Sequence, residues 1–146
     1  MVSPATSRAG LYGAIMAVVL GASLLVAGCS GDRPLPVPEI SEVTLIPAEG
    51  DKVDTILVTW EPVNDGRVEG YAIYRAEEGI GPTPGTKSEF EVEAITIALR
   101  YEDDELHVTE RYPRTRYYYR IASIPSDGPY GPMSEEASIV YEPTGS

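Results

Sequence analysis

Hydrophobic and polar residues alternate with a period of two along most of the chain beyond residue 40. This period is typical of a β-strand with one buried face. The alternation is strongest in residues 115–124 (TRYYYRIASI) and in residues 53–60, where Ile56, Val58 and Trp60 share one side. We expect strands over residues 40–47, 53–60, 68–76, 89–93, 95–101, 115–124 and 135–141.

Glycine, proline and short polar residues separate these segments. The clearest turn sequences are residues 61–66 (EPVNDG), 79–85 (GIGPTPG) and 126–129 (SDGP), and we expect the second to be a loop throughout. The pattern after residue 30 contains no convincing helical period. Short strands at near-regular spacing without helices indicate a two-layered antiparallel sandwich.

The first thirty residues have a different pattern. After Arg8, no charged residue occurs from residue 9 to residue 28, which is the layout of a secretory signal. The apolar run ends in Val26-Ala27-Gly28-Cys29, which resembles the lipobox of bacterial lipoproteins. The resemblance implies cleavage between Gly28 and Cys29 and acylation of the Cys29 thiol. An uncleaved transmembrane anchor is the main alternative, since twenty apolar residues suffice to span a bilayer, and plain secretion is a further one.

These features divide the chain into four parts. We expect a signal peptide over residues 1–28, a proline-rich tether over 29–39, one domain over 40–143 and a tail over 144–146. Alternating prolines favour an extended polyproline II tether that holds the domain off the lipid surface. The lipobox resemblance implies a bacterial cell envelope protein, lipid-anchored to a membrane outside the cytoplasm. Ser30 is compatible with the outer membrane in bacteria that sort lipoproteins by the residue after the cysteine.

Five motifs of the body resemble a fibronectin type III domain when taken in order. They are Ile56-x-Val58-x-Trp60-x-Pro62, Gly70-Tyr71-x-Ile73-Tyr74-Arg75, Tyr101-x-Asp103, Pro113-x-Thr115-x-Tyr117-x-Tyr119-x-Ile121-x-Ser123, and Ser134. The resemblance covers residues 40–143. It implies an all-β, seven-stranded, antiparallel immunoglobulin-like sandwich.

The same resemblance implies a role for each core residue. It implies that Trp60 fills the space between the sheets, that Tyr71 and Ile73 point inward from one strand, and that Tyr119 does so from another. Tyr117 matches the tyrosine corner, whose hydroxyl bonds to the backbone a few residues upstream. Two departures stand out: Arg111 occupies a position where the family often has leucine, and the segment after Ala76 is long and rich in glycine and proline.

Composition excludes several functions. The chain has 23 acidic and 11 basic residues and a formal charge of −12, which argues against binding the phosphate backbone of a nucleic acid. One cysteine and one histidine exclude a disulfide framework and argue against a Cys/His metal site. We interpret the acidic run 102–105 as a solvated loop rather than a cation site, and His107 as a solvent-facing loop residue. The sequence contains no nucleophile elbow, phosphate loop or dinucleotide fingerprint, so we expect no enzyme activity, cofactor or metal.

One cluster could carry binding. Four of the nine arginines fall within residues 111–120. If Tyr117 and Tyr119 point inward, Arg116, Tyr118 and Arg120 point outward beside Tyr74 of a neighbouring strand. Such a stripe suits stacking on a sugar or docking of a protein loop. The alternative is an ordinary sheet surface whose arginines pair with acidic neighbours.

The sequence therefore predicts a lipid-anchored envelope protein whose single domain works by binding or spacing. The expected partners are membrane lipid through Cys29 and an envelope protein or glycan. A structural subunit of an envelope assembly and an accessory carbohydrate-binding module are the alternatives.

Overall fold

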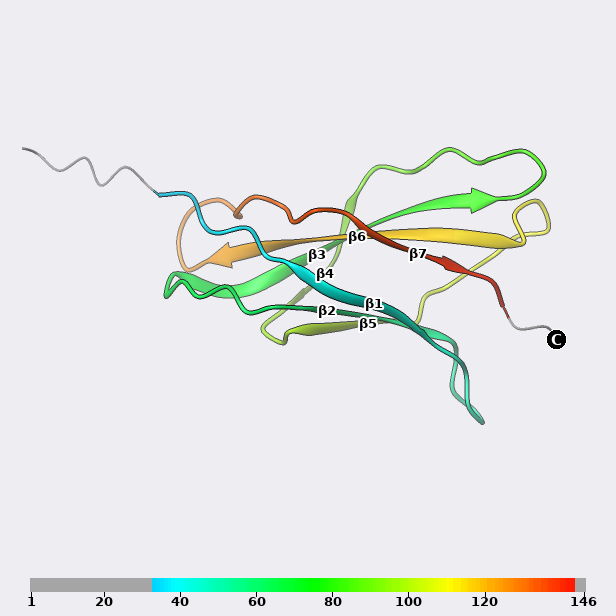
Figure 1. Ribbon diagram of the computed structural model, residues 1–146, viewed down its shortest axis with the longest axis horizontal. Helices are drawn as coiled ribbons and strands as arrows, with labels where there is room; N and C mark the ends of the chain where they lie inside the picture. Colours follow the sequence, from blue (N-terminus) through cyan, green and yellow to red (C-terminus); the bar gives the residue numbers. More distant parts are fainter. Residues whose placement is uncertain (1–32, 144–146) are drawn as a thin grey trace, which may run out of the picture. The chain divides into compact units, whose positions relative to one another are not determined.

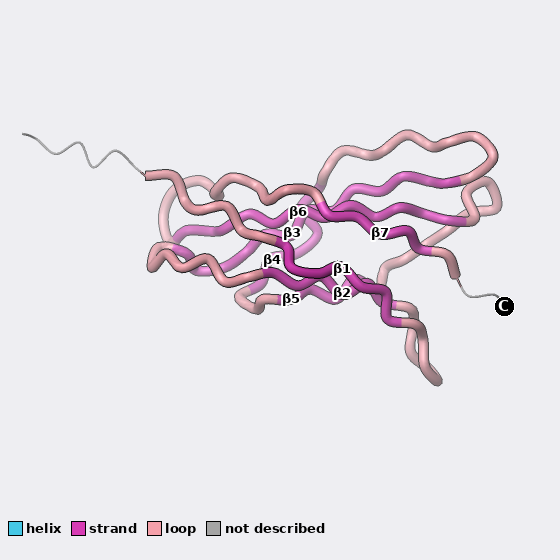
Figure 2. The backbone as a smooth tube through the Cα atoms, viewed as in Figure 1, coloured by secondary structure: helices cyan, strands magenta, loops and turns pink. Residues whose placement is uncertain are grey.

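The computed structural model describes residues 33–143. The predicted signal peptide, its cleavage site at Gly28-Cys29, the start of the tether and the tail 144–146 lie outside the described residues. The described chain consists of strands and loops (Figure 2). Within residues 33–143, no helix is long and apolar enough to cross a bilayer.

Seven strands form two antiparallel sheets. One sheet has the order β1-β2-β5 and the other β4-β3-β6-β7 (Figure 1). The strands are β1 (Ile40–Ile46), β2 (Thr55–Trp60), β3 (Val68–Ile80), β4 (Glu91–Thr96), β5 (Arg100–Asp103), β6 (Arg114–Pro125) and β7 (Ala137–Tyr141). The predicted all-β, seven-stranded antiparallel sandwich is confirmed.

The core lies between the inner faces of the two sheets. Because side chains alternate along a strand, every second residue of β2, β3 and β6 points into this core. The Trp60 ring packs edge-on against the Tyr71 ring, with centroids 5.6 Å apart. The buried apolar cluster comprises Ile56, Val58, Trp60, Tyr71, Ile73, Tyr117, Tyr119, Ile121 and Tyr141.

Strands β3 and β6 define the two ends of the sandwich. They pair along their whole length, from Val68 opposite Pro125 to Ile80 opposite Arg114. The chain enters beside the first pair, at what we call the tether pole, and we call the other end the distal pole. In Figure 1 the tether pole lies at the left and the distal pole at the right.

Two strand boundaries differ from the prediction. Strand β3 continues to Ile80, although residues 79–85 were expected to be a loop, because β6 offers a backbone partner as far as Arg114. The turn between β4 and β5 lies at residues 97–99 rather than near residue 94. Alternation through VEAITIAL continues across this turn and therefore does not reveal it.

The described part of the tether is not a free spacer. Residues 33–39 have no regular structure, yet Leu35 is only 8% exposed. Leu35 lies against Gly131, where an added Cβ would come within 3.1 Å of the Leu35 Cβ. The amide of Glu61 also donates a hydrogen bond to the carbonyl of Glu39, at 3.0 Å. This part of the predicted tether therefore does not stand free of the domain, because an apolar side chain within it is buried against the sandwich.

Candidate binding surfaces of the sandwich

The outer face of the four-stranded sheet carries the predicted stripe. The register places Tyr74 opposite Arg120, Ala76 opposite Tyr118 and Glu78 opposite Arg116. The stripe residues therefore share one face, but Tyr118 is only 8% exposed. The expectation that Tyr118 is open to solvent is wrong.

The segment between β3 and β4 covers the middle of the stripe. It runs back along β3, where the Ser88 amide donates to the carbonyl of Glu77 at 2.9 Å. This places the Lys87 ammonium 3.9 Å from the centre of the Tyr118 ring. The Tyr118 hydroxyl donates to the Glu78 carboxylate beneath. Tyr118 is thus part of the internal packing of this segment rather than a binding residue.

Arg120 is also engaged within the molecule. Its guanidinium lies 5.0 Å from the centre of the Phe90 ring and 3.6 Å from the Glu136 carboxylate. Lys87 forms an ion pair with the same Glu136 and lies over the same Phe90 ring. These contacts leave Arg116 as the only cationic residue of the predicted stripe that forms no ion pair within the described chain.

Arg116 has two cationic neighbours near the distal pole. Arg114 precedes it on the same face of β6, and Arg111 lies in the turn just before that strand. Arg111 and Arg114 are exposed, and neither forms an ion pair with any residue of 33–143. We call Arg111, Arg114 and Arg116 the distal arginines.

A packed turn supports the distal arginines. The Thr109 amide donates to the carbonyl of Tyr112 at 2.9 Å, and the Tyr112 amide donates back to the carbonyl of Thr109 at 3.0 Å. The Tyr112 ring lies on Gly79, where an added Cβ would be 2.4 Å from the ring. At Gly81, an added Cβ would be 2.4 Å from the carbonyl oxygen of Arg111. The turn therefore packs on Gly79 at the end of β3 and on Gly81 just after it.

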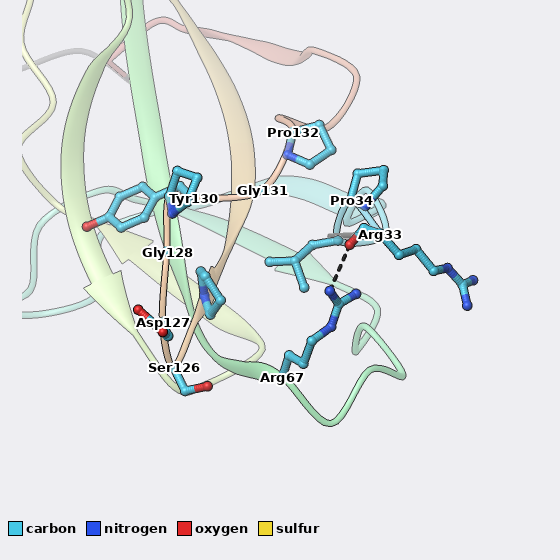
Figure 3. A pocket seen from close by; sticks show the side chains of 12 residues that line it. Arg33, Pro34, Arg67, Ser126, Asp127, Gly128, Tyr130, Gly131 and Pro132 are labelled. Atoms are coloured by element: carbon cyan, nitrogen blue, oxygen red, sulfur yellow. Dashed lines mark hydrogen bonds between the residues drawn. The ribbon is translucent and has the colours of Figure 1, made fainter. Parts of the chain in front are cut away.

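A cleft of about 490 Å³ lies at the tether pole (Figure 3). Its walls are the tether at Arg33–Leu35, Arg67, Pro125 at the end of β6, and residues 126–132 of the β6–β7 loop. The Arg67 guanidinium donates to the carbonyl of Arg33 at 2.7 Å. Because one wall is the tether itself, the cleft marks the seam along which the tether docks on the sandwich.

Asp65 orients Arg67 at this seam. Its carboxylate accepts two hydrogen bonds from the Arg67 side chain, at 2.7 and 3.0 Å. The side-chain hydrogen bond to Arg67 and a second one from the Arg67 amide lower the pKa of Asp65 to about 2. Asp65 therefore stays ionised, and Arg67 stays held, well into the acidic range.

The acidic run 102–105 is not a solvated loop at Asp103. This residue lies in β5 and is 0% exposed. Its carboxylate accepts bonds from the Arg75 guanidinium at 2.9 and 3.0 Å, from the Tyr119 hydroxyl at 2.6 Å and from the Glu105 amide at 3.2 Å. The interpretation of Asp103 as a solvated residue is corrected, because these four hydrogen bonds replace its hydration.

This network joins the two sheets. Arg75 extends inward from β3 and Asp103 from β5 of the opposite sheet. Burial acts to lower the pKa of Arg75, but the hydrogen bonds and charge of Asp103 outweigh it, and the pKa is raised. Burial, followed by the charge of Asp103, raises the pKa of Tyr119. The period-two pattern already placed Arg75 in line with Tyr71 and Ile73, so the need for a buried acidic partner could have been inferred.

Tyr117 fastens the loop before β6. Its hydroxyl accepts a hydrogen bond from the His107 amide at 2.8 Å and donates to the His107 carbonyl at 3.3 Å. Burial raises the pKa of Tyr117 to about 12. The His107 side chain itself is 56% exposed, and its Nε2 lies 3.4 Å from the Glu77 carboxylate. In the part of the chain that the structure describes, no three histidine, cysteine or acidic side chains are grouped so as to hold a metal ion.

Comparison with known proteins bears on the fold. The sequence matches no protein-family model and no curated protein. The structure is similar to the sixth fibronectin type III domain of human fibronectin type III domain containing protein 3, with a TM-score of 0.52 and 20% identity over 82% of this chain and 96% of that domain. A fibronectin type III domain of human fibronectin type III domain containing protein 3 gives a TM-score of 0.47 at 20% identity, over 80% of this chain and 94% of that one. Residues 33–143 therefore have the fold of a fibronectin type III domain.

Proposed function

We propose that this protein is a lipid-anchored module of the bacterial cell envelope that binds an acidic protein segment through the distal arginines, without catalysis. One observation carries the binding role: three neighbouring arginines form no ion pair within residues 33–143 of a chain whose formal charge is −12. Other arginines of the described chain are paired, as in Arg67 with Asp65, Arg75 with Asp103 and Arg120 with Glu136.

The chemistry of arginine favours a carboxylate partner. A guanidinium presents a planar fork of donors that matches a carboxylate with two parallel hydrogen bonds. Charges on a protein surface are screened beyond about 8 Å at physiological ionic strength. A partner that contacts the distal arginines therefore feels these three cations more strongly than the net negative charge of the molecule.

The spacing of the arginines favours an extended peptide. Arg114 and Arg116 occupy alternate positions of β6 and share its outer face. Alternate residues of a strand are roughly 6.7 Å apart. Acidic side chains at alternate positions of an extended peptide repeat at the same distance, so two carboxylates can meet the two guanidinium groups in register.

The anchor rests on the sequence. Residues 9–28 carry no charge and end in Val26-Ala27-Gly28-Cys29, the arrangement that resembles a lipobox. A chain held through Cys29 would enter the sandwich at the tether pole, whereas the distal arginines begin β6 at the opposite end. Anchoring and binding would then use opposite ends of one small domain, which suits a receptor fixed to a membrane.

Binding is tested with two peptides and two triple variants. The probes are an alternating Glu-Thr peptide and its Gln-Thr analogue. We expect the acidic peptide alone to bind, with an affinity that falls as salt is added. The variant R111Q/R114Q/R116Q should lose this binding, and R33Q/K52Q/R100Q, which removes the same charge elsewhere, should keep it. Equal losses of binding in both variants would mean that only the net charge of the molecule matters and would contradict a site at the distal arginines. Binding of an acidic polysaccharide but not of the acidic peptide would contradict a protein partner and indicate a glycan.

The anchor is tested by mass and by extraction. The intact mass of the membrane-extracted protein should equal residues 29–146 plus acyl groups. The variant Cys29→Ala should be released from vesicles by an alkaline wash. A mass that matches all 146 residues would contradict the anchor and favour an uncleaved transmembrane segment.

A further inference from the structure

Apolar side chains cross the outer face of the four-stranded sheet near the tether pole. The register aligns Ile95 of β4, Ala72 of β3, Ala122 of β6 and Met133 in one row. The two alanines form a buried floor, at 0% and 1% exposure. Ile95 and Met133 at the ends of the row are 62% and 41% exposed.

Two further residues extend this row toward the pole. Ile97 is 85% exposed, and its Cγ2 lies 3.9 Å from where a Cβ on Gly70 would be. Tyr130 is 44% exposed, and its ring is directed from the β6–β7 loop back across β3 (Figure 3). We call Ile95, Ile97, Tyr130 and Met133 the apolar face. Exposed large apolar side chains that gather in this way are typical of a contact surface.

The chain enters the sandwich next to this face. Leu35 is packed against Gly131, the residue that follows Tyr130. Only three residues separate Arg33 from Cys29 in the sequence. Four residue steps span at most about 14 Å, even when fully extended. An acyl group on Cys29 would therefore place a bilayer within that distance of the tether pole.

We propose that the apolar face rests on the bilayer that holds Cys29. This inference depends on the lipid anchor proposed above. The anchor keeps the membrane surface at a high effective concentration, so that even a small apolar contact is favoured over a partner that must arrive from solution. Aromatic and aliphatic side chains such as Tyr130 and Ile97 suit the boundary between headgroups and acyl chains. The negative charge of the molecule opposes adsorption to anionic lipid, so the contact is apolar rather than electrostatic.

The position of the face is tested by labelling the acylated full-length protein in phosphatidylcholine vesicles. Acylation blocks the thiol of Cys29, so a cysteine introduced by Ile97→Cys or Met133→Cys is the only one that reacts with a fluorescent probe. The control is Val53→Cys, because Val53 is 58% exposed and lies in the β1–β2 turn at the distal pole. We expect a quencher confined to the lipid phase to act several-fold more strongly on probes at 97 and 133 than on the probe at 53.

Each outcome bears on a different claim. Equal quenching at the three positions in protein of acylated mass would overturn the bilayer contact and leave the anchor intact. A blue-shifted emission at 97 that the lipid quencher does not reach would show that protein, such as a second copy of the chain, covers the face. Absence of the acylated mass would defeat the anchor and the bilayer contact with it. Circular dichroism of each labelled variant should match that of the unmodified chain, because the substituted side chains are exposed.

Discussion

Asp103 carries a fully buried carboxylate that connects the two sheets through Arg75. If Asp103→Ala removes this carboxylate, Arg75 keeps only Glu93, whose Oε2 lies 3.4 Å from the Arg75 Nε. A buried ion pair that loses its shorter contact leaves the remaining charge poorly compensated, so we expect the free energy of unfolding to fall by about 3–5 kcal/mol. Urea unfolding of the purified variant measures this loss.

A double variant separates the buried charge from the packing. Arg75→Met with Asp103→Leu removes both members of the buried ion pair and keeps most of their volume. We expect the double variant to be more stable than Asp103→Ala alone. A double variant less stable than Asp103→Ala would mean that attraction within the ion pair far exceeds the cost of desolvating its two charges. That result would contradict the expected gain.

Because of Tyr117, we expect the free energy of unfolding to fall as the pH rises in the alkaline range. Its pKa is raised from 10.0 to about 12 by burial, so the folded state favours the neutral phenol. This contribution is complete below pH 10 and is lost as the pH rises through about 12. Each unit of pKa shift corresponds to about 1.4 kcal/mol, so the loss is on the order of 3 kcal/mol.

The variant Tyr117→Phe isolates this contribution. It removes both hydrogen bonds to His107, so near neutral pH its free energy of unfolding should be lower by about 1–3 kcal/mol. The difference between the wild type and the variant should shrink between pH 10 and about 12, as the wild type ionises. Denaturant unfolding over this range measures it, and a constant difference would contradict the raised pKa of Tyr117.

At the scale of elements, the end of β3 packs directly against the turn before β6. A Cβ at Gly79 would stand 2.4 Å from Cγ of Tyr112, so Gly79→Ala must displace the turn that carries Arg111. We expect a loss of about 1–3 kcal/mol in unfolding free energy, as for other overpacked sites. Gly66→Ala is the matched control, because nothing lies within 4 Å of its added Cβ. Thermal melts of the two variants compare them, and equal melting temperatures would show that the turn yields freely.

The segment between β3 and β4 explains why the observed surface differs from the predicted stripe. Alternation along β6 correctly separates inward Tyr117 and Tyr119 from outward Tyr118, because it depends only on strand geometry. Whether an outward residue stays exposed depends on a loop that returns over it. The contacts of Lys87 with Tyr118 and Glu136 span 31 and 49 residues of sequence, and no local pattern encodes them.

At the scale of the whole molecule, the sandwich follows from the sequence more directly than its surfaces do. Seven strands that must each bury one face can pack together in only a few ways. Trp60, Tyr71 and Tyr117 lie in one core because they point from the inner faces of the two sheets. The surfaces depend on where the tether and the loops pack. The burial of Leu35 among alternating prolines is the clearest case, since the same composition favours a free polyproline II spacer.

Docking of the tether would set how closely the proposed lipid anchor holds the sandwich. Leu35→Ala removes most of the side chain that fastens residues 33–39 to Gly131, and we expect a loss of about 1–2 kcal/mol in unfolding free energy. The larger effect should be local: amide exchange at Leu35, Val37 and Glu39 should become faster while that of β3 and β6 stays slow. In vesicles, the longer free tether should reduce lipid quenching of a probe at position 97. Unchanged exchange in residues 33–39 would mean that the carbonyl of Arg33, held by Arg67, is enough to keep the tether docked.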